Sequence, residues 1–165
     1  MHACASSFVV YRFGYYEEFY IFACSCVNAR VRKTSNFNKN IMKKVIATPD
    51  APKAVGPYSQ AIEVNGTLYI SGQIPVNPAD GQVQTEITAA AHQSLKNIGA
   101  ILKEAGMTYD NVVKTTVLLA DIADFKAVNE VYAEYFTGDK PARACYQAAA
   151  LPLGVKVEIE AIAVK

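Results

Sequence analysis

From residue 42 onward, hydrophobic and polar positions alternate in short blocks whose period changes along the chain. Three blocks bounded by turn residues predict strands: residues 43–47, 56–64 and 67–74. The Asn65-Gly66 pair between the second and third blocks is typical of a two-residue hairpin turn, so these strands should pair antiparallel. Residues 75–83 ("PVNPADGQV") then indicate a loop.

Two stretches have the three- and four-residue spacing of an amphipathic helix. The first spans residues 86–105, with Thr85 as the expected N-cap and Gly106 as the expected C-cap. Its apolar positions are Ile87, Ala91, Leu95, Ile98, Leu102 and Ala105. The second should begin at a cap formed by Asp124. Its apolar stripe comprises Phe125, Val128, Tyr132 and Tyr135 or Phe136.

Three more strands complete the predicted fold. Residues 111–120 form one between the helices, and residues 142–150 and 155–164 follow the second helix. A turn at residues 151–154 separates the last two, and we expect them to pair through it. The order βββαβαββ, with both helices on one face of a mixed sheet, predicts a two-layer α+β domain.

The last strand has two unlike faces. Its period of two places Val155, Val157, Ile159, Ala161 and Ala163 on one side. The other side carries Lys156, Glu158, Glu160, Ile162 and Val164. Because this second side begins charged and ends apolar, Glu158 and Glu160 should approach an interior or an interface. A solvated strand edge is the alternative interpretation.

Arg143 is the only arginine after residue 42, where the other ten basic residues are lysines. It faces the same side of its strand as Cys145, and pairing through the turn would add Glu158 to form one patch. In one interpretation Arg143 bridges a neighbouring glutamate and Cys145 is a small buried hydrophobe. In the other, the planar guanidinium grips the carboxylate of a ligand through two parallel hydrogen bonds.

The first 41 residues differ from the rest in composition and in hydrophobic pattern. They hold nine of the seventeen phenylalanines and tyrosines and three of the four cysteines, without a sustained period. Their longest uncharged runs are eleven residues, whereas a membrane span needs about 20. We expect residues 1–41 to be a disordered extension or a mis-assigned start, and residues 42–165 to be one domain that works in the cytoplasm. Organellar targeting by the basic, acid-free stretch "NARVRKTSNFNKN" is a less favoured alternative.

Charge and motif content exclude several classes of function. Residues 42–165 carry eleven basic and thirteen acidic side chains, with no run of more than two basic residues, which disfavours a nucleic-acid surface. His92 has no partner at metal-binding spacing, and no phosphate-binding glycine loop or nucleophile elbow occurs. We therefore expect no metal and no organic cofactor, and no membrane association.

Six motifs in residues 42–165 together resemble the RidA/YjgF family. They are "GPYSQA" (residues 56–61), "ISGQIPVNP" (70–78), "VVKTTVLLADIADF" (112–125), "VNEVY" (128–132), "PARACY" (141–146) and "VEIEAIA" (157–163). The resemblance implies a chorismate-mutase-like fold assembled as a homotrimer, with sites in the clefts between subunits. It also implies a 2-iminobutanoate/2-iminopropanoate deaminase that hydrolyses imines released by pyridoxal-phosphate-dependent threonine and serine dehydratases. This role limits metabolite damage and connects to isoleucine biosynthesis.

The same resemblance assigns roles to individual residues. It implies that Arg143 binds the substrate carboxylate and that Glu158 holds or activates the attacking water. The remaining substrate-binding positions are Tyr58, Ser71, Gly72, Asn129 and Cys145, the last as a contact rather than a nucleophile. Ala144 stands where serine is frequent in the family. This difference bears on which substrate side chain the site prefers more than on the type of reaction. A ribonuclease acting as a translation inhibitor, or a non-catalytic ligand-binding or chaperone-like protein, stays open as an alternative.

Overall fold

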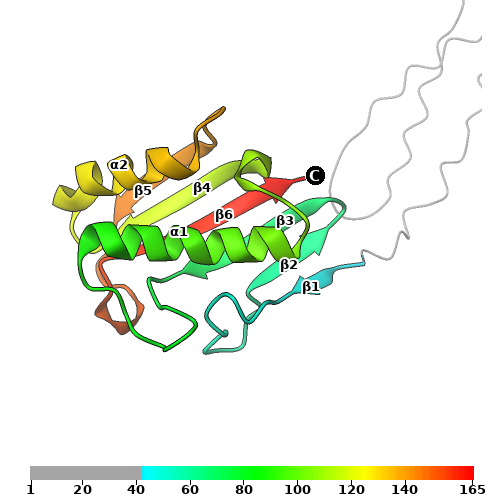
Figure 1. The fold of residues 1–165 in the computed structure, drawn as a ribbon, viewed down its shortest axis with the longest axis horizontal. Coiled ribbons are helices and arrows are strands. Elements are labelled where there is room, and N and C mark those ends of the chain that lie inside the picture. Colours follow the sequence, from blue (N-terminus) through cyan, green and yellow to red (C-terminus); the bar gives the residue numbers. More distant parts are fainter. Residues whose placement is uncertain (1–41) are drawn as a thin grey trace, which may run out of the picture. The chain divides into compact units, whose positions relative to one another are not determined.

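The computed structural model describes residues 42–165, which form one six-stranded sheet with two helices on one side (Figure 1). The strands are β1 (Lys44–Ile46), β2 (Ala61–Val64), β3 (Thr67–Gln73), β4 (Val112–Leu119), β5 (Ala142–Gln147) and β6 (Val157–Val164). The helices are α1 (Ile87–Glu104) and α2 (Phe125–Tyr135). The chain order and the α+β class match the expectation, and the strand order across the sheet is β1-β2-β3-β6-β4-β5.

The caps of α1 show how its ends are fixed. Glu86, rather than the expected Thr85, is the N-cap, and its carboxylate accepts a 2.8 Å hydrogen bond from the Ala89 N–H. A carboxylate there also interacts favourably with the positive end of the helix dipole. At the other end Gly106 has φ 69°, and its N–H donates to the Lys103 carbonyl at 3.0 Å. Glycine adopts this left-handed conformation without a Cβ penalty, but the C-cap is Ala105, one residue before the expected Gly106.

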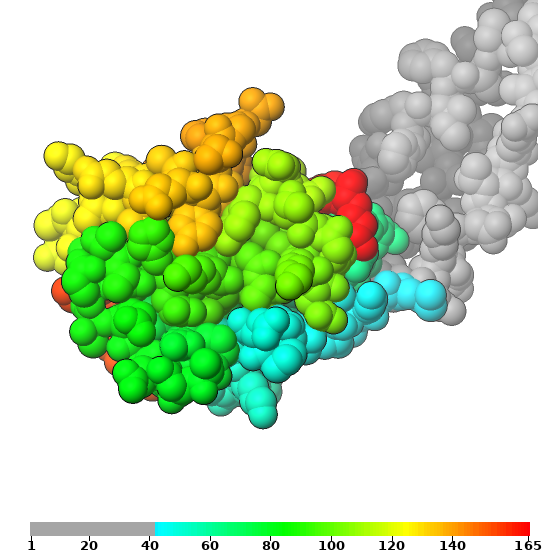
Figure 2. Space-filling view, in the orientation of Figure 1, coloured from blue at the N-terminus to red at the C-terminus, as the bar shows by residue number. Residues whose placement is uncertain are grey.

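The core lies between the sheet and the two helices. The apolar stripe expected for α1 is buried from Ala91 through Leu102, and only Ile87 is partly exposed. The side of β6 that carries Val157, Ile159 and Ala161 packs beneath α1, as its period of two predicts. Figure 2 shows this side of the molecule, where side chains of α1 (green) and α2 (yellow) form the surface above the strands.

The expected pairing of the last two strands is wrong. β5 pairs with β4 in parallel, whereas β6 lies antiparallel between β3 and β4. The connection β4–α2–β5 is a helical crossover, which returns the chain parallel to the strand it left. Residues 152–154 form a short 3₁₀ turn that carries the chain past the end of β4, and the Ala148 N–H donates to the Leu119 carbonyl there.

The segment before β2 is a loop anchored by Gln60. The strand expected from residue 56 begins only at Ala61. The buried Gln60 amide donates to the carbonyls of Thr48, Ala51 and Pro52 at 2.8–3.1 Å and accepts from the Thr48 N–H at 2.8 Å. These four bonds replace a strand ladder, and they hold the loop that carries Tyr58.

Candidate active site

A β-bulge interrupts the pairing of β3 and β6. Ile70 stands opposite Ala161 and Gln73 opposite Ile159, so Ser71 and Gly72 together oppose a single residue. The Ser71 hydroxyl donates to the Ser59 carbonyl at 2.7 Å, which ties the bulge to the loop before β2. Bulges of this kind bend a strand and redirect its side chains.

The Glu158 carboxyl lies directly over Gly72. A Cβ built on Gly72 would fall 1.8 Å from Glu158 Oε1, so only glycine leaves room for the carboxyl in this position. Glu158 is partly buried on β6, and burial, reinforced by the nearby Glu160 carboxylate, raises its pKa. A carboxylate with a raised pKa accepts a proton more readily, which suits a general base.

Tyr58 and Gly72 border the same hollow, which has a volume of about 340 Å³. Tyr58 is half exposed at the end of the loop anchored by Gln60. The loop after β3 supplies Ile74, Val76 and Asn77, and Leu153 closes the hollow from the connection before β6. Four predicted residues therefore gather around β3 and β6, and we call Tyr58, Ser71, Gly72 and Glu158 the β3/β6 group.

A second group of predicted residues lies against α2. Arg143 is exposed, and its guanidinium carbon lies 4.6 Å from the ring centroid of Tyr132 and 5.6 Å from that of Phe125. Asn129 is four residues after Phe125 and three before Tyr132, so it shares their face of α2. With Cys145, which follows Arg143 by two on β5, these residues form the α2/β5 group: Asn129, Arg143 and Cys145.

The two groups face opposite sides of the sheet, so the expected single patch of Arg143, Cys145 and Glu158 is wrong within one chain. Arg143 stands beside Thr115 of β4, whose side chain is buried under α2. Glu158 stands beside Leu118, three residues further along β4 and therefore on the other face. The error follows from the assumed β5–β6 pairing, because β4 in fact separates these two strands.

Cys145 is a poor candidate for a nucleophile. It is partly buried against the core, and burial raises the pKa of its thiol, although the charge of Arg143 opposes the shift. A thiol with a raised pKa stays protonated near neutral pH, whereas nucleophilic cysteines are thiolates.

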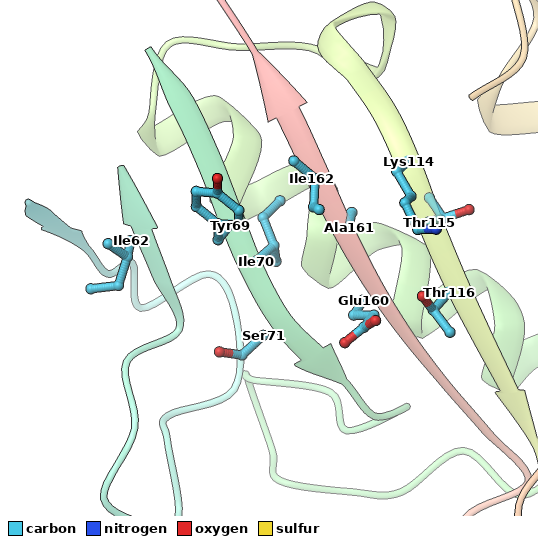
Figure 3. Close-up of a pocket in the computed structure, with 10 residues that line it drawn as sticks. All are labelled: Ile62, Tyr69, Ile70, Ser71, Lys114, Thr115, Thr116, Glu160, Ala161 and Ile162. Atoms are coloured by element: carbon cyan, nitrogen blue, oxygen red, sulfur yellow. The ribbon is translucent and has the colours of Figure 1, made fainter. Parts of the chain in front are cut away.

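The sheet face away from the helices is open and hollowed. Ser71 borders a depression of about 300 Å³ that crosses β2, β3, β6 and β4. Figure 3 shows Glu160 of β6 between Ser71 of β3 and Thr116 of β4. Across residues 42–165, no three His, Cys, Asp or Glu side chains are placed to share a metal ion. No helix in this part of the chain is both long and apolar enough to cross a bilayer.

Sequence reasoning assigned Phe125 and Tyr132 only to the apolar stripe of their helix. The structure places both rings against the guanidinium of Arg143. Their spacing around Asn129, a polar residue already singled out, was the available signal that this helix face borders a site.

A family model described as "Endoribonuclease L-PSP" matches residues 48–165. This is the RidA/YjgF family that the six motifs indicate. The chain belongs to this family. Members of the RidA/YjgF family among solved structures have the same fold, which confirms the expected chorismate-mutase-like α+β domain.

Named relatives of the RidA/YjgF family are close in sequence. The 2-iminobutanoate/2-iminopropanoate deaminase of Mus musculus is 59% identical over 127 residues, which cover 76% of this chain and 94% of the relative. The chloroplastic Reactive Intermediate Deaminase A of Arabidopsis thaliana is 51% identical over 75% of this chain and 67% of its own length. The crystal structure of E. coli TdcF with bound serine has a TM-score of 0.72 and 42% identity, covering 74% of this chain and 98% of that one.

Proposed function

We propose that this protein hydrolyses 2-imino acids and their enamine tautomers to 2-oxo acids and ammonia. The observation that carries the proposal is the guanidinium of Arg143, which is exposed and has no carboxylate within ion-pair distance in residues 42–165. A guanidinium without a carboxylate partner is available to bind the carboxylate of a ligand through two parallel hydrogen bonds. The sequence similarity to relatives named 2-iminobutanoate/2-iminopropanoate deaminase supports the same reaction.

In the proposed reaction, Arg143 fixes the substrate carboxylate and thereby the position of the imine carbon. Glu158 takes a proton from a water molecule whose oxygen attacks that carbon, and the C=N double bond becomes a C–N single bond. The resulting carbinolamine then loses ammonia as its oxygen forms the carbonyl of the 2-oxo acid. The proton taken by Glu158 passes to the imine nitrogen as the carbinolamine forms, and Glu158 then carries the hydroxyl proton of the carbinolamine to the departing nitrogen. Both protons of the water therefore leave with ammonia, and one water is consumed for each ammonia released. A positioned general base of this kind contributes about 10² to 10⁴ in rate.

We propose that the complete site forms between subunits of a homotrimer. Arg143 and Glu158 face opposite sides of one sheet, so one chain cannot present both to one substrate. A site that combines the α2/β5 group of one copy with the β3/β6 group of the next resolves this. The open sheet face supports assembly, because Tyr69 is half exposed there beside Ile62 and Ile162 in adjacent strands. Light scattering should give a mass about three times that of the 17.9 kDa chain.

A coupled assay tests the reaction. Threonine dehydratase supplies 2-iminobutanoate, semicarbazide competes for it, and the release of 2-oxobutanoate is followed with the full chain, with Arg143→Ala and with Lys126→Ala. Lys126 is an exposed cation of α2 and is the matched control for charge removal. We expect the full chain and Lys126→Ala to accelerate the release of 2-oxobutanoate, and Arg143→Ala to give no acceleration. No acceleration by the wild-type chain would reject the proposed function.

The description of the family model favours one alternative, an endoribonuclease. Residues 42–165 carry more acidic than basic side chains, and an RNA groove needs clustered cations. Incubation of the full chain with single-stranded RNA decides between the two activities. RNA cleavage that survives in Glu158→Gln but not in Arg143→Ala would favour the alternative.

The domain assignment and the cellular location belong to the same proposal. We propose that residues 42–165 are the catalytic unit and that the protein works in the cytoplasm. Residues 1–41 lie outside the described residues. Fluorescent fusions of the whole chain and of residues 42–165 test this, and organellar import of the longer fusion alone would assign targeting to residues 1–41.

A further inference from the structure

The guanidinium of Arg143 is oriented by aromatic rings rather than by a carboxylate. Its carbon lies 4.6 Å from the ring centroid of Tyr132 and 5.6 Å from that of Phe125. The one ion pair within residues 42–165 joins Lys165 to Glu63, far from β5 in the sheet order. A guanidinium that lies over a ring is held through its face, so the N–H donors around its rim stay available to a carboxylate.

The ring of Tyr132 is itself fixed. Tyr132 is 6% exposed, its hydroxyl lies 2.8 Å from Thr115 Oγ1, and its ring centroid is 4.4 Å from that of Phe136. Thr115 is buried in β4 and is the register neighbour of Arg143 in β5. The hydrogen bond therefore ties the ring to the same pair of strands that carries the guanidinium. Burial raises the pKa of Tyr132, so its hydroxyl remains protonated and able to hydrogen-bond near neutral pH.

Phe125 provides a weaker contact. It is the first residue of α2, is 40% exposed, has no hydroxyl and lies about 1 Å further from the guanidinium than Tyr132. Cation–π attraction is stronger where the pair is shielded from water. The buried Tyr132 should therefore dominate the orientation of Arg143.

We propose that Tyr132 is the positioning residue for the Arg143 carboxylate clamp, with the Thr115 hydroxyl as the anchor of its ring. This inference rests on the proposed function, because it concerns how Arg143 binds the substrate. Tyr132 acts through Arg143 and does not itself touch the reacting atoms. Its contribution depends on the negative potential of the ring face and not only on the volume of the side chain.

A series of fluorinated side chains separates these two contributions. Tyr132 is replaced in the full chain by phenylalanine and then by phenylalanines with one, two and three ring fluorines, which nearly keep the shape while weakening the ring potential. We expect KM to rise steadily along the series, by about tenfold in total, with kcat within about twofold. The reason is that Tyr132 contacts Arg143, which binds the substrate carboxylate and not the reacting atoms. The same series at Phe125 is the matched control and should raise KM by less than about threefold.

A double-mutant cycle tests whether the effect passes through Arg143. In an Arg143→Lys background the fluorine series at position 132 should change KM by less than about twofold, since the ammonium is a strongly hydrated point charge on a flexible stem and is not held over the ring as the guanidinium is. A flat series in the Arg143 protein, or an equal slope in both backgrounds, would overturn the inference while leaving imine hydrolysis intact. If the wild-type chain gives no acceleration in the imine assay, the proposed function itself fails.

Discussion

At the scale of single residues, the proposed reaction depends on where three polar side chains are held. Arg143 is exposed over two rings, Glu158 is held over a glycine, and Cys145 is protonated against the core. Each of these states follows from a neighbour: Tyr132 for the arginine, Gly72 for the glutamate, and burial for the thiol. The residue type alone does not specify them.

Arg143→Lys should lower kcat/KM by at least about tenfold, because lysine keeps the charge but loses the second parallel hydrogen bond to the carboxylate. The coupled imine assay measures this loss. Lys126→Arg is the control, because it exchanges the same two residue types in the reverse sense outside the candidate site. Near-normal turnover by Arg143→Lys would remove the clamp.

Glu158→Gln should lower kcat by about 10² to 10⁴, because glutamine cannot accept the proton of the attacking water. In the wild type, kcat/KM should fall as pH drops through the raised pKa of Glu158, above the range of an ordinary glutamate. A pH profile with its acid limb at the ordinary glutamate value would contradict the role of burial.

The same raised pKa predicts a stability effect with a fixed sign. The folded state holds the Glu158 proton more tightly than the unfolded state does, so this group stabilises the protein at low pH and that contribution is lost as pH rises through the folded pKa. Relative to Glu158→Gln, the wild type should therefore gain thermal stability between about pH 7 and about pH 4. Paired thermal melts across this range measure the difference, and an opposite trend would mean that the carboxylate is stabilised in the fold.

At the scale of elements, two loops and one bulge carry the β3/β6 group. Ser71 and Gly72 occupy the bulge in β3, while Gln60 and Asn97 hold the loops on either side of the nearby hollow. The Asn97 amide donates to the carbonyls of Ile74 and Val76 at 3.1 and 3.0 Å. Irregular backbone is therefore held by buried amides at these two places beside the hollow.

Gly72→Ala tests the bulge. The new methyl group would displace the Glu158 carboxyl, whose side chain is able to move, so kcat should fall by about 10²-fold with little change in melting temperature. Gly99→Ala is the matched control, because its Cβ would lie 2.3 Å from the Tyr109 hydroxyl, away from the candidate site. That variant should change stability and leave kcat unaltered.

Gln60→Ala should lower the free energy of unfolding by about 2 to 4 kcal/mol, because it leaves the Thr48 N–H and three carbonyls without their partner. Denaturant melts measure the loss. In the imine assay KM should rise as well, since the same loop carries Tyr58.

At the scale of the whole molecule, the sheet separates the two groups that the proposed reaction combines. The α2/β5 group lies on the helix side and Glu158 on the open side of the same sheet. In the proposed trimer one copy supplies half of each site, so we expect activity to require assembly.

Mixing two inactive variants tests this condition. Arg143→Ala and Glu158→Gln, unfolded together and refolded as mixed trimers, should recover about a quarter of the wild-type rate. Random mixing gives that fraction of sites with an intact arginine from one copy and an intact glutamate from the next. Trimers refolded from either variant alone serve as controls, and no recovery in the mixture would place both residues in one copy.

The sequence by itself determined the elements, their order and the identity of the candidate residues. Periods of 3.6 and 2 fixed the buried faces of α1 and β6, and glycine chemistry fixed the end of α1, because these signals are local in the chain. Only the tertiary structure decided which strands are neighbours. The turn before β6 is compatible with a hairpin, but the crossover through α2 places β5 beside β4 and leaves β6 to pair on the other side of β4. That long-range choice, which no local pattern encodes, puts Arg143 and Glu158 on opposite faces of the sheet.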